Sequence, residues 1–322
     1  MGKSLCTVVL VCLGLGASAK FSLKDDNAHL TLLENGKPVL VYNYARVAPP
    51  EKVPEHFGRA CYIHPVYGLD GDVLTEDFPV DHYHHRGVFW AWPECKVGER
   101  RLNVWEMPDA HQHHEKWLVR EAGADKAEIG MQDFWSFDDA PDKPMVREEI
   151  RFTVLPANDK GRTIDFYLKL TNVSTETVTF LGAKGKGYGG LCVRPDAGRL
   201  PFTFTTASGV CKDDALSFDT AWADVTSKVK PDGVTSGIAI FEHPKNPGYP
   251  FPGWIFRHYG FLGASWPHEK EHALKPSEFF ELRYRLFIHR GAAEDANIKQ
   301  RFEEYTAGAR KTRAADSPFE GG

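Results

Sequence analysis

The chain has few cysteines for its length, and their spacing argues against the simplest zinc-binding modules. Six cysteines occur in 322 residues, and no two of them form a C-x-x-C pair. Zinc ribbons and related sites use such closely spaced thiolates. After the first nineteen residues the cysteines are Cys61, Cys95, Cys192 and Cys211, an even number that allows three pairings. The sequence leaves open whether any of them form a disulfide or remain buried free thiols.

Long hydrophobic runs and an excess of basic residues are also lacking. No stretch approaches the roughly 20 apolar residues that a membrane-spanning helix requires, so we expect no membrane span. Lys and Arg number 39 against 44 Asp and Glu, for a formal net charge of −5. Nucleic acid binding ordinarily needs a clustered basic surface. The charge balance therefore gives no reason to expect a nucleic acid partner.

The first nineteen residues have the pattern of a secretory signal peptide. Lys3 supplies the positive start, and residues 5–15 form an apolar stretch too short to span a bilayer comfortably. Ala17, Ser18 and Ala19 then form a small-residue cleavage site. We therefore expect residues 1–19 to be removed near Ala19, which makes the protein secreted or periplasmic.

Strand patterns dominate the rest of the chain. Residues 163–171 and 279–289 alternate apolar and polar side chains, which is typical of half-buried antiparallel strands. The dipeptide Asn35-Gly36 between two apolar segments is a strong hairpin signal. Shorter strands fit residues 28–33, 38–44, 146–155, 177–181 and 237–242. Internal repeats and low-complexity linkers are absent, so the sequence predicts an all-β fold, one large antiparallel β-sandwich over residues 20–305.

One short helix is predicted at the C-terminal end of this sandwich. Residues 292–305 place Ile298, Phe302 and Tyr305 on one stripe among charged side chains, as in an amphipathic helix. The remaining residues, 306–322, are predicted to form a polar tail.

Fourteen histidines are many for this length, and three of them lie in residues 81–87, which read D-H-Y-H-H-R-G. In an extended segment His82, His84 and Arg86 would share one face, and His85 would take the other. Imidazoles and a guanidinium are unfavourable in a protein core, because burying their polar groups without hydrogen-bond partners costs free energy. Histidine also serves as acid, base or metal ligand near neutral pH. The cluster therefore indicates a functional site, and the alternative is a set of solvated loop histidines.

Polar residues set among aromatics occur elsewhere in the chain as well. The candidates in these segments are Arg59, His64, His243, Asn246, Trp254 and Arg257. Sugar sites are built this way, because aromatic faces stack on C–H surfaces while Arg, Asn and His side chains bond hydroxyls. The alternative is that the aromatics of residues 254–259 belong to the core.

Short motifs spread over nearly the whole chain show a family resemblance. The motifs are Arg59-x-x-Tyr62-Ile63-His64-Pro65, Asp81-His82-x-His84-His85-Arg86-Gly87, Gly189-Gly190-Leu191-x-x-Arg194, Gly237-Ile238-Ala239, His243-Pro244-x-Asn246-Pro247, Leu274-Lys275-Pro276, Leu282-x-Tyr284-Arg285 and His289-Arg290-Gly291. In this order they resemble the PmoA-like family of unknown function, whose automatic label is "methane oxygenase". A particulate methane oxygenase subunit of that name is an integral membrane protein, whereas this chain has no spanning segment.

The predicted sandwich with its histidine-glycine segment is also similar in outline to galactose-mutarotase-like supersandwich proteins. Those proteins bind sugars on a concave sheet, where a histidine and a carboxylate move protons. In this comparison His85 resembles the histidine that faces the sugar, and Arg59 resembles the arginine of the entrance loop.

The leading hypothesis is a secreted carbohydrate-active protein: a mutarotase-like epimerase, or a lyase or hydrolase on the same scaffold. His85 would donate or accept the proton, with His64 or His84 as its partner, and Asp81 could supply a carboxylate. The residues expected to bind the substrate are Arg59, His82, Arg86, His243, Asn246, Trp254 and Arg257. The partner would be a mono- or oligosaccharide, and no cofactor is expected.

Two alternatives remain open at the level of sequence. A noncatalytic glycan-binding module would use the same aromatics without proton transfer. A zinc or copper site would draw on Asp81, His82, His84 and His85, since imidazole is a common ligand of both metals. In an extended segment only His82 and His84 converge, so His64 or His243 would have to help. The identity of the sugar and the oligomeric state are not indicated by any motif.

Overall fold

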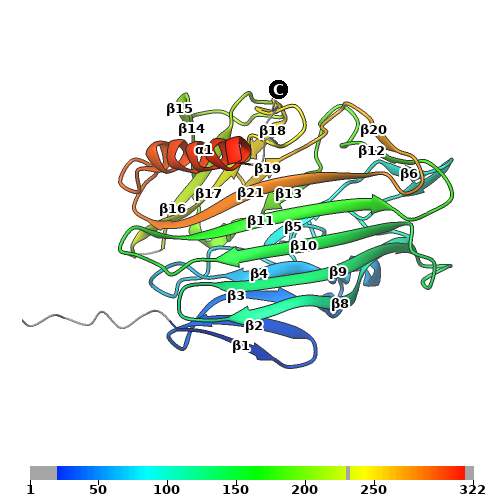
Figure 1. Ribbon diagram of the computed structural model, residues 1–322, viewed down its shortest axis with the longest axis horizontal. Helices are drawn as coiled ribbons and strands as arrows, with labels where there is room; N and C mark the ends of the chain where they lie inside the picture. Colours follow the sequence, from blue (N-terminus) through cyan, green and yellow to red (C-terminus); the bar gives the residue numbers. More distant parts are fainter. Residues whose placement is uncertain (1–19, 230–232, 316–322) are drawn as a thin grey trace, which may run out of the picture.

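The computed structural model describes residues 20–229 and 233–315, so the predicted signal peptide, residues 1–19, lies outside the described residues. Three antiparallel sheets account for the strands of the described part, and the two larger ones form a sandwich (Figure 1). The prediction of a large antiparallel β-sandwich with one C-terminal helix is confirmed.

The eight-stranded sheet contains the first hairpin, and its strands have four to seven residues. Its strands are β1 (Phe21–Asp25), β2 (His29–Glu34), β3 (Lys37–Asn43), β4 (Tyr62–Val66), β5 (Val88–Ala91), β13 (Gly190–Val193), β18 (Trp254–Arg257) and β19 (Phe261–Ala264). In space their order is β1-β2-β3-β4-β5-β13-β19-β18. The predicted hairpin joins β2 to β3, and Asn35 and Gly36 have φ values of 52° and 77°. A two-residue type I′ turn requires positive φ at both positions, which explains this dipeptide.

The nine-stranded sheet contains the long strands with clear alternation. Its strands are β8 (Ala110–Ala122), β9 (Ala127–Phe137), β10 (Val146–Val154), β11 (Gly161–Asn172), β14 (Thr203–Thr206), β15 (Gly209–Cys211), β16 (Trp222–Lys228), β17 (Thr235–Glu242) and β21 (Phe279–Arg290). Their order is β15-β14-β16-β17-β21-β11-β10-β9-β8. The two strands predicted from alternation, β11 and β21, lie side by side, with Leu168 opposite Leu282. The apolar positions of both strands are buried, as the period of two requires.

A small third sheet and two short 3-10 helices complete the connections. The sheet is formed by β6 (Cys95–Val97), β7 (Arg100–Leu102), β12 (Val178–Phe180) and β20 (His272–Leu274), in the order β20-β12-β6-β7. The 3-10 helices are η1 (Glu55–Phe57) and η2 (Ala197–Arg199).

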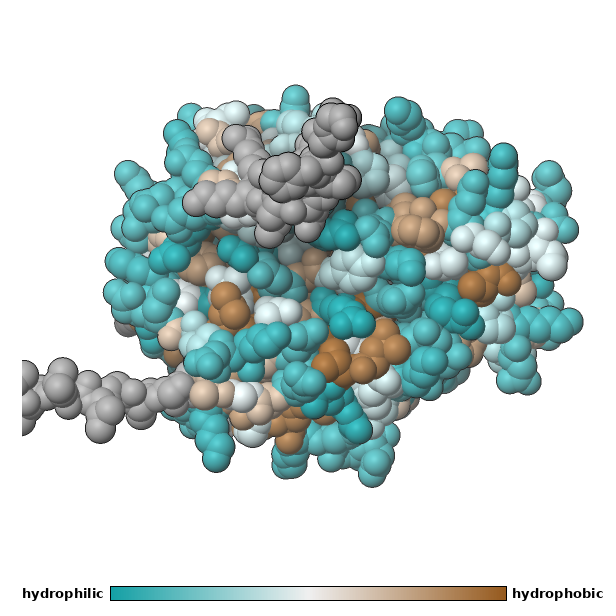
Figure 2. Space-filling model, in the orientation of Figure 1, coloured by the Kyte–Doolittle hydropathy of each residue, from teal (hydrophilic) through white to brown (hydrophobic). Residues whose placement is uncertain are grey.

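The core lies between the two large sheets. The indole of Trp90 on β5 donates a 3.1 Å hydrogen bond to Glu148 on β10, and the ring of Trp92 lies 5.8 Å from that of Trp135 on β9. Buried apolar side chains of both sheets form one contiguous cluster. Each large side chain in it contributes roughly 1.5–3 kcal/mol through burial. The outer face of the nine-stranded sheet is predominantly hydrophilic (Figure 2).

The helix α1 (Ile298–Ala315) is shifted relative to the predicted span of residues 292–305. It begins later because Asn297 has a φ of 54°, a left-handed conformation that an α-helix cannot include. It also extends ten residues beyond Tyr305, into the stretch predicted as a polar tail. The predicted stripe is nevertheless the packed face, since Phe302 contacts Phe241 of β17 on the outer side of the nine-stranded sheet.

All four cysteines of the described residues carry free thiols, so the disulfide alternative is wrong for them. Cys61, Cys95 and Cys192 are buried, and Cys211 is half-buried. Among the described residues, no helix combines the length and the apolar character needed to cross a membrane.

Candidate functional site

The histidine segment is a pair of turns, and the prediction of an extended segment is wrong. The N–H of His82 donates to the carbonyl of Pro79 at 3.0 Å, and the N–H of His85 donates to the carbonyl of His82 at 2.9 Å. Because these turns come directly before β5, the period-two alternation of a strand does not apply. His82 and His85 therefore lie on the same side, with their rings stacked 4.7 Å apart, whereas the extended segment would have separated them.

The three imidazoles line a cleft of about 550 Å³. Its other lining residues include Trp105, Glu106, Lys186, Tyr188, Arg257 and Tyr259. On β5, Trp90 points into the core between the sheets, so its neighbour Phe89 points to the opposite face. The ring of His85 lies 5.9 Å from Phe89 and 5.1 Å from Phe261 of β19. The cleft therefore lies on the outer face of the eight-stranded sheet.

Two of the imidazoles are held in the neutral form. Burial is the largest cause that lowers the pKa of His84, and together with the neighbouring His82 and Arg59 it brings this pKa to about 3. Burial also lowers the pKa of His85 well below its ordinary value, with the two other histidines as the next causes. His85 is only 1% exposed, whereas His84 is partly exposed. A ligand in the cleft would therefore meet His84 before His85.

His82 contacts the carboxylate of Asp81, which in turn accepts a hydrogen bond from Arg194. Asp81 Oδ2 lies 3.0 Å from His82 Nδ1, and Asp81 Oδ1 accepts a 2.8 Å hydrogen bond from Arg194. Burial raises the pKa of Asp81, but His82 and Arg194 together lower it below its ordinary value. On its other face His82 stacks on Tyr259, with the ring centroids 4.9 Å apart. The result is a three-ring stack of His85, His82 and Tyr259 at the cleft.

Arg257 is held at the cleft by two partners. Its Nε donates to Asp214 Oδ2 at 2.8 Å, and its Nη1 donates to the hydroxyl of Tyr188 at 2.7 Å. This pairing fixes the guanidinium plane, and the side chain remains partly exposed. A fixed, partly exposed guanidinium can bond ligand hydroxyl or carboxylate oxygens.

Arg59 and Arg86 lie beneath the cleft and are fully buried. Arg86 pairs with Asp77 at 3.1 Å and donates to the carbonyl of His85 at 2.9 Å. Arg59 donates to the carbonyl of His84 at 3.4 Å and has no carboxylate partner among the described residues. Burial, followed by the charge of Arg86, lowers the pKa of Arg59 to about 9. Both arginines hold the backbone of the histidine turns, so they act as positioning residues in this structure.

The remaining predicted site residues lie away from the cleft lining. His64 contacts Thr75, with Nδ1 and Oγ1 3.1 Å apart. His243 lies beside α1, its ring 5.5 Å from that of Tyr305, and Asn246 donates to the carbonyl of Arg283 at 2.9 Å. Trp254 is 1% exposed and belongs to the core, so neither face of its ring is available for stacking on a sugar.

Several residues of the site were not among the predicted site residues. They include Trp105, Glu106, Lys186, Tyr188, Arg194 and Tyr259. Tyr188 lies in the glycine-rich stretch before β13, and Arg194 closes one of the family motifs, so both had a local signal. Trp105 had none, because it reaches the cleft from a turn after β7.

The arrangement of the donor side chains bears on the metal alternative. Within residues 20–229 and 233–315, no three His, Cys, Asp or Glu side chains are arranged so that they could hold a metal ion. The histidine cluster thus lacks the ligand set that the zinc or copper alternative requires.

The fold and site define a β-sandwich protein with a histidine-lined cleft on the outer face of one sheet. Residues 29–303 match the family of unknown function DUF6807, and the chain belongs to that family. This match gives no support to the PmoA label that the motif resemblance suggested. No curated protein matches the chain.

Solved structures with similar folds include galactose mutarotase-like proteins. A galactose mutarotase-like protein from Lactobacillus casei ATCC 334 is 8% identical to this chain, with a TM-score of 0.35. The match covers 84% of this chain and 100% of that protein. Galactose 1-epimerase from Lactobacillus acidophilus NCFM is 10% identical, with a TM-score of 0.38, and the match covers 85% of this chain and 99% of the epimerase. The galactosidase domain of alpha-galactosidase-sucrose kinase is 10% identical with a TM-score of 0.41, covering 86% of this chain and 40% of that one. The chain thus spans less than half of the last of these.

Proposed function

We propose that the protein is carbohydrate-active, and that it binds a sugar in the histidine-lined cleft and moves a proton on it through His84. One observation supports this above the others. His84 is a partly exposed imidazole kept neutral by its surroundings, with its ring 4.6 Å from that of His85 and 5.8 Å from that of Trp105. A neutral imidazole can accept a hydroxyl proton, and the aromatic rings suit the C–H face of a sugar.

The reaction that fits best is interconversion of the two anomers of an aldose. A base removes the proton of the anomeric hydroxyl while an acid protonates the ring oxygen, so the bond between the anomeric carbon and the ring oxygen breaks. Rotation and reclosure, with both proton transfers reversed, give the other anomer. His84 would take the first proton, and a solvent water would give a proton to the ring oxygen, while Glu106, which also lines the cleft, would accept a hydrogen bond from a sugar hydroxyl. Arg257 would bond a hydroxyl and orient the ring.

The experiment is a proton NMR time course with freshly dissolved α-D-galactose and α-D-glucose. We expect the protein to accelerate the decay of the α-anomeric signal. His84→Gln should lose about 10²-fold of the acceleration or more, as expected when a general base is removed. His64→Gln is the matched control, because His64 is a half-buried histidine of a different family motif and lies outside the cleft, so this variant should behave as the unmodified protein does. The catalytic proposal is wrong if no sugar in a broader panel equilibrates faster than in buffer.

A noncatalytic glycan-binding module is the second candidate, favoured by the aromatic lining of the cleft. In that case sugar affinity, measured by calorimetry, would survive His84→Gln and fall with Tyr259→Ala, because stacking would dominate binding. Loss of affinity in His84→Gln together with loss of anomer exchange would favour the enzyme.

A further inference from the structure

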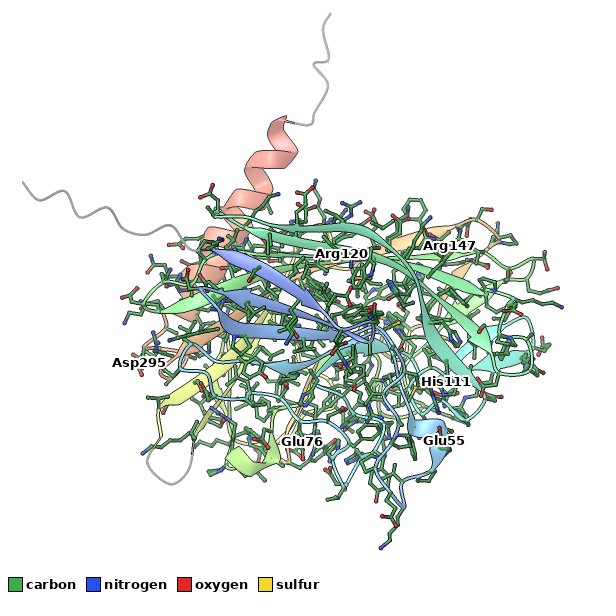
Figure 3. All side chains as sticks on the ribbon, turned by 90° about the horizontal axis from the view of Figure 1, so that it is seen from below. Glu55, Glu76, His111, Arg120, Arg147 and Asp295 are labelled. Atoms are coloured by element: carbon green, nitrogen blue, oxygen red, sulfur yellow. The ribbon has the colours of Figure 1, made fainter. Side chains whose placement is uncertain are left out.

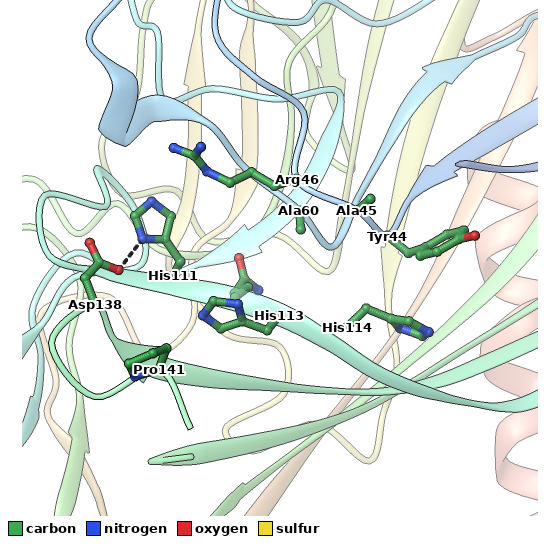
Figure 4. Close-up of a pocket in the computed structure, with 10 residues that line it drawn as sticks. Tyr44, Ala45, Arg46, Ala60, His111, His113, His114, Asp138 and Pro141 are labelled. Carbon is green, nitrogen blue, oxygen red and sulfur yellow. Dashed lines mark hydrogen bonds and ion pairs between the residues drawn. The ribbon is translucent and has the colours of Figure 1, made fainter. Parts of the chain in front are cut away.

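A second pocket, of about 640 Å³, lies beside β8 and shares no lining residue with the cleft (Figure 4). Residues 111–114 of β8 line it on one side, and residues 44–46 line it on the other. The 3-10 helix η1 lies between the two sites, since the carbonyl of His56 faces His111 Nε2 at 3.0 Å and the ring of Phe57 contacts that of His84. Figure 3 shows Glu55 of η1 and His111 at the same end of the molecule.

His114 in this pocket is oriented by a buried carboxylate. Asp133 is 0% exposed, and its Oδ1 lies 2.8 Å from His114 Nδ1 while its Oδ2 accepts a 2.5 Å hydrogen bond from the hydroxyl of Tyr42. A carboxylate only accepts, so an imidazole with a single proton carries it on Nδ1 in this position. Nε2 is then left as an acceptor, and no hydrogen-bond partner for it occurs in the described part of the chain. The side chain of His114 is 13% exposed, packed between Tyr44 and Trp117.

The neighbouring histidines are not arranged in this way. Both nitrogens of His111 face acceptors, Asp138 Oδ1 at 2.7 Å and the carbonyl of His56, so His111 can offer no free acceptor (Figure 4). His113 stacks on Phe134 with the ring centroids 5.0 Å apart and has no carboxylate beside it. His114 alone of these three combines a buried carboxylate with an unpaired nitrogen at the pocket.

The other polar groups of the pocket point to a neutral ligand with hydroxyl donors. Gln112 donates from Nε2 to Glu148 Oε1 at 3.0 Å, which leaves its amide oxygen as a second acceptor. The charged side chains are each paired, Arg46 with Glu55 at 2.5 Å and Asp138 with the imidazole of His111 at 2.7 Å. The pocket therefore has little net charge to attract an ion.

We propose that this pocket is a second ligand site, for a neutral polyhydroxylated molecule the size of a hexose or cyclitol. One ligand hydroxyl donates to His114 Nε2, and another donates to the amide oxygen of Gln112. Tyr44, Ala45 and Ala60 supply an apolar wall for the C–H groups. The inference does not depend on the function proposed for the cleft.

The test is carbethoxylation of the protein by diethyl pyrocarbonate, with each histidine quantified from peptide fragment spectra. The reaction is run with and without D-galactose, D-glucose or myo-inositol at increasing concentration. We expect at least one of these probes to protect His114 saturably, while His29 on β2, whose side chain is 40% exposed, stays reactive. The proposal is overturned if none of the three protects His114 at any concentration, including the case in which only His82 and His84 are protected.

Variants separate this site from the cleft. His114→Gln should weaken binding of the protecting probe about 3- to 10-fold, the effect of one hydrogen bond. His113→Gln leaves both acceptors in place and should retain the affinity, and His84→Gln should not alter the protection of His114. Loss of protection in His84→Gln would locate the binding in the cleft and contradict the proposal. If His114→Gln fails to fold, the protection experiment on the unmodified protein decides alone.

Discussion

The imidazole of His82 lies parallel to that of His85, with the ring centroids 4.7 Å apart and the planes inclined by 4°. Burial is the largest cause of the lowered pKa of His85, and the stacked ring of His82 is one of the groups that cover it. The same ring of His82 also covers Tyr259. His82 therefore contributes through packing to keeping His85 neutral.

Removing this shield should raise the pKa of His85. In His82→Ala water reaches the ring, so we expect His85 to titrate between about pH 5 and pH 7, near the ordinary range of histidine. In His82→Phe an aromatic ring preserves the stack, and His85 should stay neutral. Imidazole NMR titrations of both variants measure this difference. A His85 that already titrates near pH 6.5 in the unmodified protein would contradict it.

Trp254 and Tyr259 should have opposite roles in stability and binding. Trp254 is buried in the core, so Trp254→Ala should cost about 3–5 kcal/mol of the free energy of unfolding. Tyr259 lines the cleft, and Tyr259→Ala should cost less stability but weaken sugar binding. Urea unfolding and calorimetry on both variants make the comparison. Trp254→Phe serves as the control, and a loss of sugar affinity in this variant at unchanged fold would argue against the assignment.

Glu242 should make the protein less stable as the pH rises. Burial raises the pKa of its carboxyl from 4.5 to about 8, against the opposing effect of the Phe251 N–H, which donates to it at 3.0 Å. The folded protein therefore keeps a proton that the unfolded chain releases. This contribution to stability is present below about pH 4.5 and is lost as the pH rises to about 8.

The measurement is urea unfolding of the unmodified protein and of Glu242→Gln at about pH 5 and about pH 8. Burial also raises the pKa of Glu148 to about 8, so Glu148 too lowers the free energy of unfolding as the pH rises. Both proteins contain Glu148, so the difference between their pH dependences isolates Glu242. We expect Glu242→Gln to be less sensitive to pH by on the order of a few kcal/mol, since one pKa unit corresponds to about 1.4 kcal/mol. If the free energy of unfolding changes equally with pH in the two proteins, Glu242 is ionised in the folded protein and the prediction is wrong.

The thiols should differ in reactivity. Burial raises the pKa of the Cys61, Cys95 and Cys192 thiols well above the ordinary value, and all three are inaccessible. Cys211 is half-buried, at the exposed edge strand β15. Brief alkylation of the native protein should label Cys211, and the other three should be labelled only after unfolding. Resistance of Cys61, Cys95 and Cys192 to alkylation even after unfolding without reductant would indicate disulfides instead.

The sequence predicted the fold better than the site. Strands β11 and β21 were predicted because alternation with a period of two is a local property, read directly from neighbouring residues. The hairpin at Asn35 and Gly36 followed from the φ values that its turn requires. The start of α1 was missed because the conformation of Asn297 is not visible in an apolar stripe.

By itself, the sequence determined that the chain forms antiparallel strands with one helix, and that histidines gather before β5. Only the tertiary structure decided which polar side chains meet. His114 and Asp133 are brought together by the register of β8 against β9, and Arg257 reaches Tyr188 from a distant segment. Trp254 and His243, by contrast, were placed away from the cleft. The physical reason is that side-chain periodicity is local, whereas strand order and register result from the packing of the whole core.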